Sequence, residues 1–190
     1  MDTQDPQELA EAATYPFKTY CALLVSVLAL VLALNNLGGS NTGKEATMNN
    51  ILAANTYSFY QAKSVRQTEY KLAADRIELQ LATEKPSPAA KELLEKKLAD
   101  YQKTIKRYDS DPENGEGKKE LLAKAKQLEA DRDLALRKDP WFDYAEGLLQ
   151  LAIVLTSVAI ITDRRSMFNA ALLLGAVGSL CTLNGYFLFY

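Results

Sequence analysis

The chain has 190 residues, of which 48% are hydrophobic and 24% charged, with a formal net charge of −2. Outside residues 38–144 only nine charged residues occur, and the stretch itself is nearly neutral, which argues against a nucleic-acid partner. The sequence contains no histidine, the commonest general base and metal ligand, so we expect no enzyme, cofactor or metal site.

The first apolar run follows a short N-terminal segment, residues 1–16, and extends from Phe17 to Leu37. About 20 apolar residues cross the roughly 30 Å hydrocarbon core of a bilayer, so 17–37 is predicted to be the first transmembrane helix. A cleaved signal peptide is the competing interpretation, because the uninterrupted apolar core is only Cys21–Leu34. The acidic flank and the lack of an obvious small-x-small cleavage site favour an uncleaved anchor.

The next stretch, residues 38–144, is predicted to be a helical domain outside the membrane. The glycine-rich segment Gly38–Gly43 is expected to break the first helix, and a long helix is expected from 47 to 85. The same glycines nearly form a phosphate-binding loop, but Glu45 stands where that motif needs Ser or Thr. Pro86 ends the long helix, and Ser87 is the expected N-cap of the next.

Apolar residues at heptad spacing indicate that the helices of this domain pack against one another. In the second helix the spacing is four, three, four, three, and the residues are Leu94, Leu98, Tyr101, Ile105 and Tyr108. The long helix has Val65, Leu72 and Leu79 at seven-residue intervals. With a third helix over 118–138, these patterns predict an antiparallel three-helix coiled coil that also oligomerises, because the two shorter helices are not expected to cover the long one.

The turn at 109–117 resembles a calcium-binding loop only in part. Counted from Asp109, the first, third, fifth and twelfth positions of such a loop are acidic, namely Asp109, Asp111, Glu113 and Glu120. The glycine required at the sixth position is Asn114. No metal site is therefore predicted.

Two further spans, residues 145–162 and 167–190, are joined by the short loop 163–166, which predicts an antiparallel hairpin. Asp139 is the expected N-cap of the second span, with Pro140 at its first position. Arg164 and Arg165 place the loop in the cytoplasm by the positive-inside rule, which puts the helical domain in the periplasm.

The third span has small residues four apart, Ala171, Gly175 and Ser179, beside Gly178 and Thr182. Such seams let helices approach closely where lipid supplies no hydrophobic driving force. The seam could pack within one chain, against Ala152, Thr156 and Ala159 of the second span, or between copies, and the sequence does not decide.

The candidate interaction or pathway residues lie near the membrane boundaries. Glu146 is ionisable and one turn inside an apolar segment, where such residues are often functional, with Lys63 or Arg66 as a possible partner. Glu146 lies at helical spacing from Asp139 and Asp143. Aromatic side chains are expected to form a collar at the bilayer surface. The remaining candidates are Gln150, Asn184, Trp141, Phe142, Tyr144, Tyr57, Phe59 and Tyr60.

Two motifs resemble a family of bacterial inner-membrane proteins classified as a domain of unknown function. They are Phe59-Tyr60-Gln61-Ala62-Lys63-Ser64 and Asp139-Pro140-Trp141-Phe142, and together with the order of spans the resemblance covers most of the chain from Phe17. It implies an α-helical protein of the bacterial inner membrane and no particular activity.

We expect an all-α membrane protein with three transmembrane helices and an extramembrane coiled-coil domain between the first and second. The expected function is that of a non-enzymatic structural or interaction protein, a homo-oligomeric scaffold or an accessory subunit of a larger membrane complex. The alternative is an oligomeric channel or transporter component, resting on Glu146, Gln150 and Asn184.

Overall fold

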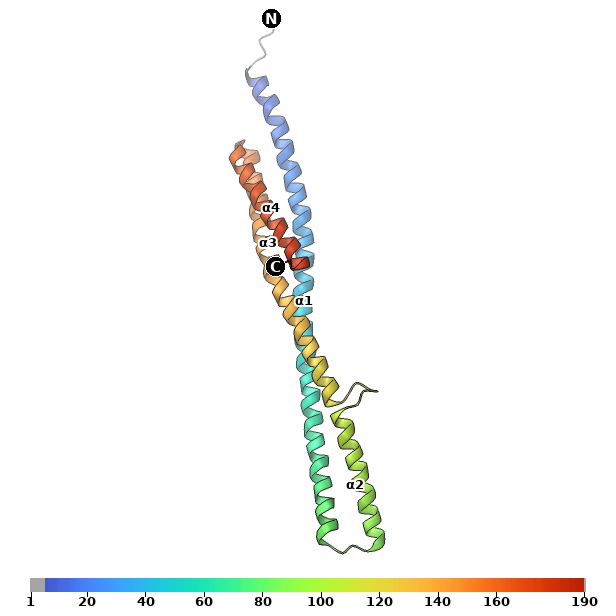
Figure 1. Cartoon of the computed structure of the whole chain (residues 1–190). Coiled ribbons are helices and arrows are strands. Elements are labelled where there is room, and N and C mark those ends of the chain that lie inside the picture. The colour runs from blue at the N-terminus through green and yellow to red at the C-terminus, as the bar shows by residue number, and fades with distance from the viewer. Residues whose placement is uncertain (1–5, 190) are drawn as a thin grey trace. The chain divides into compact units, whose positions relative to one another are not determined.

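The computed structural model describes residues 6–189, with side chains from residue 16 onward, so residues 1–5 of the predicted N-terminal segment and Tyr190 lie outside it. The described residues form four α-helices and no strand (Figure 1), which confirms the all-α class. The helices are α1 (Pro6–Thr83), α2 (Pro88–Asp109), α3 (Lys118–Thr162) and α4 (Arg165–Phe187). The chain divides into unit 1, Met1–Ala46 with Asp133–Tyr190, and unit 2, Thr47–Arg132.

The expected helix break at Gly38–Gly43 is wrong, because α1 runs through this segment without interruption. Gly38 instead allows aromatic side chains of α3 and α4 to pack closely against α1. A Cβ atom at Gly38 would lie 2.7 Å from Cζ of Phe142 and 2.8 Å from Cζ of Tyr186. The absence of a side chain therefore lets two aromatic rings rest on the backbone of α1, and this packing outweighs the low helix propensity of glycine.

The predicted helix start at Asp139 is also wrong, because α3 is continuous from Lys118 to Thr162 and contains Pro140. A proline inside a helix removes one backbone hydrogen bond and costs about 3 kcal/mol. The residues that follow, Phe142, Ala145 and Leu149, are all buried. Their packing holds this part of α3 helical in spite of the proline.

Unit 1 is a bundle of three helix segments, from α1, α3 and α4. Its core cluster contains Leu28 of α1 with Leu149 and Ala152 of α3. The small residues of α4 face this core, since a Cβ on Gly178 would lie 3.0 Å from Leu149, and Leu28 lies against Gly175. Two residues, Asp163 and Arg164, connect α3 to α4, which is shorter than the predicted loop of four.

Three of the described helices are long and apolar enough to cross a membrane, by length and composition. They are α1, α3 and α4, in the order expected from the sequence. Large apolar side chains on the outside of unit 1 are mostly exposed, including Leu23, Leu30, Leu173 and Leu180 at 61–67%. Many exposed leucines on the outside of a small bundle are typical of a membrane protein.

In unit 2 the chain reverses direction at residues 84–87, so that α2 runs back along the end of α1 as a helical hairpin (Figure 1). The predicted N-cap of α2 is confirmed, because the Ser87 hydroxyl accepts a hydrogen bond from the backbone N–H of Ala90 at 3.3 Å. The predicted polar turn is also present, and it connects Asp109 to Lys118.

The helices α2 and α3 contact successive stretches of α1. Gln67 of α1 donates to the carbonyl of Ile105 in α2, whereas Tyr57 of α1 donates to Glu129 in α3. Each cross-section of unit 2 therefore contains two helices, not the three expected side by side. The reason is the turn at 110–117, which lets α3 continue along α1 in the direction of α2.

The face of α1 that unit 2 covers differs from the row of large apolar residues in the sequence. Several covered residues are small or polar, such as Ala53, Gln67 and Ala74, but Ile77 is buried as well and Tyr70 packs against Tyr101 of α2. Val65, Leu72 and Leu79 are instead 60%, 55% and 63% exposed. Ile51, two heptads before Val65, is 50% exposed. We call these four residues the exposed apolar row.

Candidate functional site

A buried asparagine connects the three helices of unit 1. Asn35 of α1 is only 1% exposed. Its side-chain N–H donates to the carbonyl oxygen of Phe142 in α3 at 2.9 Å, and its oxygen accepts from the hydroxyl of Thr182 in α4 at 3.0 Å. Hydrogen bonds of this kind hold transmembrane helices together where lipid supplies no hydrophobic drive.

An aromatic pair lies beside this amide. The rings of Phe142 and Tyr186 meet edge to face with centroids 5.1 Å apart, and the Tyr186 hydroxyl donates to the carbonyl of Leu34 at 2.8 Å. Gly38 and Gly185 provide the space for the Phe142 ring. Phe142 is 3% exposed, so its predicted place in an interfacial collar is wrong.

The two neighbours of Phe142 have different environments. Tyr144 is 63% exposed, and Trp141 is half-buried with its ring 6.4 Å from that of Tyr144. These two residues remain available for the interface with lipid headgroups, where amphipathic aromatic side chains are enriched.

The predicted acidic residues of α3 line one cavity in unit 1, of about 270 Å³. Its wall contains three carboxylates, two amides and a hydroxyl, from Asp139, Asp143, Glu146, Asn35, Asn36 and Ser40, together with Gly39 and Phe142. Among the described residues, no group of three or more His, Cys, Asp or Glu could hold a metal ion. The cavity is therefore an acidic, polar hollow.

The residues proposed as a pathway have local partners. Gln150 donates to the carboxylate of Glu146 at 2.9 Å, within one turn of α3. Asn184 accepts from the backbone N–H of Phe189 at 2.9 Å. Only Glu146 of these three lines the acidic cavity.

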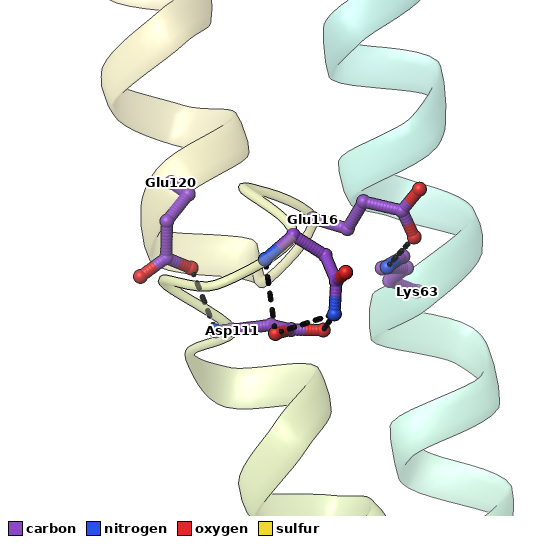
Figure 2. Close-up of polar contacts among 5 residues, drawn as sticks. Lys63, Asp111, Glu116 and Glu120 are labelled. Atoms are coloured by element: carbon purple, nitrogen blue, oxygen red, sulfur yellow. Dashed lines mark hydrogen bonds and ion pairs between the residues drawn. The ribbon is translucent and has the colours of Figure 1, made fainter.

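Lys63 of unit 2 has a partner other than the one considered from sequence. Its Nζ lies 3.1 Å from a carboxylate oxygen of Glu116, in the turn before α3 (Figure 2). The same ammonium lies 5.8 Å from the centre of the Tyr108 ring, in a cation–π contact. Lys118 makes a similar contact with Tyr60 at 5.7 Å. Lys63 thus ties α1 to the α2–α3 turn.

The acidic turn uses its carboxylates to hold its own backbone (Figure 2). Glu120 accepts from the Ser110 hydroxyl at 2.6 Å and from the Asp111 N–H at 3.1 Å, while the carboxylate of Asp111 accepts from Asn114. The hydrogen bond from Ser110, and then that from Asp111, lowers the pKa of Glu120. These contacts explain the acidic pattern as turn stabilisation.

A groove that the sequence did not indicate runs between α1 and the start of α3 in unit 2. Its volume is about 630 Å³. We call it the α1–α3 groove, and its lining residues are Leu52, Asn55, Thr56, Phe59, Ala62, Lys63, Arg66, Asn114, Gly115, Glu116, Leu121 and Lys124. Phe59, one of the predicted aromatic residues, is 65% exposed in it.

The chain has three candidate spans, a buried Asn35 that hydrogen-bonds between them, and a charged hairpin. These features define the class of α-helical proteins with several membrane spans. Within that class the chain belongs to the family described as Domain of unknown function (DUF4337), whose model matches residues 17–188. The resemblance expected from the two sequence motifs is confirmed. Neither a curated protein nor a solved structure was found to match the chain.

Proposed function

We propose that the protein is a non-enzymatic structural or interaction protein of the bacterial inner membrane that self-associates and acts as a scaffold or accessory subunit of a larger complex. The observation that carries this proposal is the exposed apolar row on α1. Ile51, Val65, Leu72 and Leu79 are each at least half exposed in the charged hairpin of unit 2. In water such a row is unfavourable unless another surface covers it.

A second copy of the chain is the proposed cover. Membrane spans give every copy the same orientation, so the rows of two copies run parallel and side by side. The members of the row are separated by multiples of seven residues, which is the repeat of a left-handed coiled coil. The coiled coil expected from the sequence is thus proposed to form between copies.

The mass of the complex extracted from native membranes in mild detergent tests this proposal. We expect Leu72→Gln with Leu79→Gln to shift the complex toward the monomer. Lys71→Gln with Glu78→Gln is the control, because it changes two exposed residues beside the row on the same helix and leaves the net charge unchanged. An unchanged mass for the leucine variant, or a monomeric wild-type protein with no partner, would contradict self-association through this row.

The alternative function is that of an oligomeric channel or transporter component. The observation in its favour is the acidic cavity of unit 1, which contains Asp143 and Glu146 on a helix apolar enough to span a membrane. Ionisable groups in such a position are often part of an ion pathway.

Substitution of Glu146 and Gln150 separates the two functions. Ion flux is measured in proteoliposomes for Glu146→Gln with Gln150→Leu, and the mass of the same variant is measured in detergent. Lost flux with an intact assembly supports transport, whereas no flux in the wild-type protein and a lost assembly in the variant support the scaffold.

A further inference from the structure

We propose that the α1–α3 groove of unit 2 binds a single-chain anionic amphiphile, a long-chain carboxylate of the fatty-acid class. This inference goes beyond the proposed scaffold function. It rests on the volume of the groove, on the order of apolar and cationic residues along it, and on the ion-pair partners of those cations.

The groove has the size of a small-molecule site. Its volume of about 630 Å³ lies within the range of roughly 300–1,000 Å³ in which such sites fall. It extends along α1 from Leu52 to Arg66, which corresponds to about 21 Å at 1.5 Å per helical residue. This length suits one extended acyl chain.

On α1 the cations lie at one end of the groove. Leu52 and Phe59 precede Lys63 and Arg66, with the polar Asn55 and Thr56 between the two apolar residues. Leu52 and Phe59 are 42% and 65% exposed, so the groove floor presents apolar surface that a hydrocarbon tail would cover. An amphiphile would lie with its tail along Leu52 and Phe59 and its carboxylate at Arg66.

The cations of the groove outnumber its acids. Lys63 is paired with Glu116, the single acid among the lining residues. Within residues 16–189, Arg66 and Lys124 have no acidic partner within 4.0 Å. A guanidinium binds a carboxylate through two parallel hydrogen bonds, so Arg66 is the proposed anchor of the head group.

Photolabelling tests the proposal on the full-length protein in amphipol. The probe is a diazirine analogue of palmitate, and mass spectrometry maps the labelled peptides. We expect labels in peptides that contain Phe59 and Leu121. Excess palmitate should compete with the probe, whereas hexadecanol, which has the same chain without the charge, should compete weakly.

The variants separate the head-group contact from general apolar binding. Arg66→Gln should lower labelling of the groove about tenfold, through the loss of charge-assisted hydrogen bonds. Arg76→Gln, an exposed arginine of the same helix outside the groove, should leave it unchanged. Circular dichroism confirms that both variants remain helical.

Three outcomes would overturn the proposal: labels confined to the spans, equal labelling of Arg66→Gln and wild type, or equal competition by hexadecanol. Capture of an acidic protein by a photoreactive residue at position 59, without palmitate labelling, would assign the groove to a protein partner instead. Each of these measurements reports probe binding in the groove whether the protein is a monomer or an oligomer. The test therefore remains valid if the protein does not self-associate.

Discussion

At the residue scale, the membrane unit depends on a few side chains that satisfy polar groups or allow close approach. Asn35 has both ends of its amide bound, to the carbonyl of Phe142 and the hydroxyl of Thr182. A buried amide of this kind is stabilising only because both ends are satisfied, since an unpaired one in an apolar bundle would be costly. Gly38 and Gly185 are needed for a different reason, because the Phe142 ring occupies the space of their side chains.

Replacement of Asn35 tests the hydrogen bonds that its amide makes to α3 and α4. We expect Asn35→Leu to destabilise the helix bundle by about 1 kcal/mol, the usual scale of interhelical hydrogen bonds in membranes. Unfolding by detergent titration or steric trapping measures the loss. Asn36→Ala is the matched control, because Asn36 is the neighbouring, exposed amide and should change stability by less than about 0.5 kcal/mol. Equal effects of the two variants would contradict the role of Asn35.

Alanine at two glycines should have opposite effects. At Gly38 the added Cβ would meet the rings of Phe142 and Tyr186, so we expect a loss of about 1–3 kcal/mol from overpacking. At Gly147 no atom lies within 4 Å of the added Cβ, so Gly147→Ala should stabilise α3 by up to about 1 kcal/mol. The same unfolding measurement compares them, and a neutral Gly38→Ala would show that the rings can move aside.

At the scale of elements, the hairpin of unit 2 depends on the turn between α2 and α3. Glu120 accepts two hydrogen bonds across this turn, and Lys63 and Glu116 attach the turn to α1 (Figure 2). Because of this turn, α2 and α3 run in the same direction along α1. Together they cover one face of α1. The opposite face of α1, with the exposed apolar row, stays available to a partner.

Acidification should weaken this turn through Glu120. Its pKa is lower in the folded protein than the ordinary value of about 4.3, because its hydrogen bonds with Ser110 and Asp111 favour the charged form. The stabilisation is therefore present above about pH 4.3 and is lost as the pH falls through the folded-state pKa.

Hydrogen exchange of the turn amides at neutral pH and at about pH 3 measures this loss. The variant Glu120→Gln should be less protected at neutral pH and should change less on acidification. Glu113→Gln is the control, because Glu113 is exposed and has no hydrogen bond or ion pair among the described residues. If Glu120→Gln and wild type lose the same amide protection on acidification, Glu120 is not the source of the pH dependence.

At the scale of the whole molecule, the order of elements places a charged hairpin between the first and second of three candidate spans. The helices α1 and α3 each contain apolar and charged stretches within one unbroken helix. Three spans require the hairpin and the α3–α4 connection to lie on opposite sides of the membrane.

Cysteine labelling checks this sidedness. Lys85→Cys marks the tip of the hairpin, and Ser166→Cys marks the α3–α4 connection while keeping Arg164 and Arg165. In a background with Cys21→Ser and Cys181→Ser, a membrane-impermeant thiol reagent applied to intact cells should label position 85. Position 166 should react only after the membrane is permeabilised. The reverse pattern would invert the proposed orientation, and labelling of both positions would contradict three spans.

The sequence by itself determined the helical class, the three apolar segments, the N-cap at Ser87 and the family. The first three follow from composition, hydrophobic length and local capping chemistry, all of which act over short stretches of chain, whereas the family follows from the resemblance of the motifs at 59–64 and 139–142. The positions of the helix ends near Gly38 and Asp139 were mispredicted. There, packing against residues more than a hundred positions away outweighed the local preference of glycine and proline.

Only the tertiary structure decided which faces of the helices are covered. Val65, Leu72 and Leu79 have heptad spacing, yet α2 packs against another face of α1, which includes Gln67, Tyr70 and Ala74. A heptad pattern on one helix does not record which face its partner covers, because that depends on how the side chains of both helices fit together. The amide of Asn35 and the α1–α3 groove likewise exist only where distant segments meet, so no local pattern could predict them.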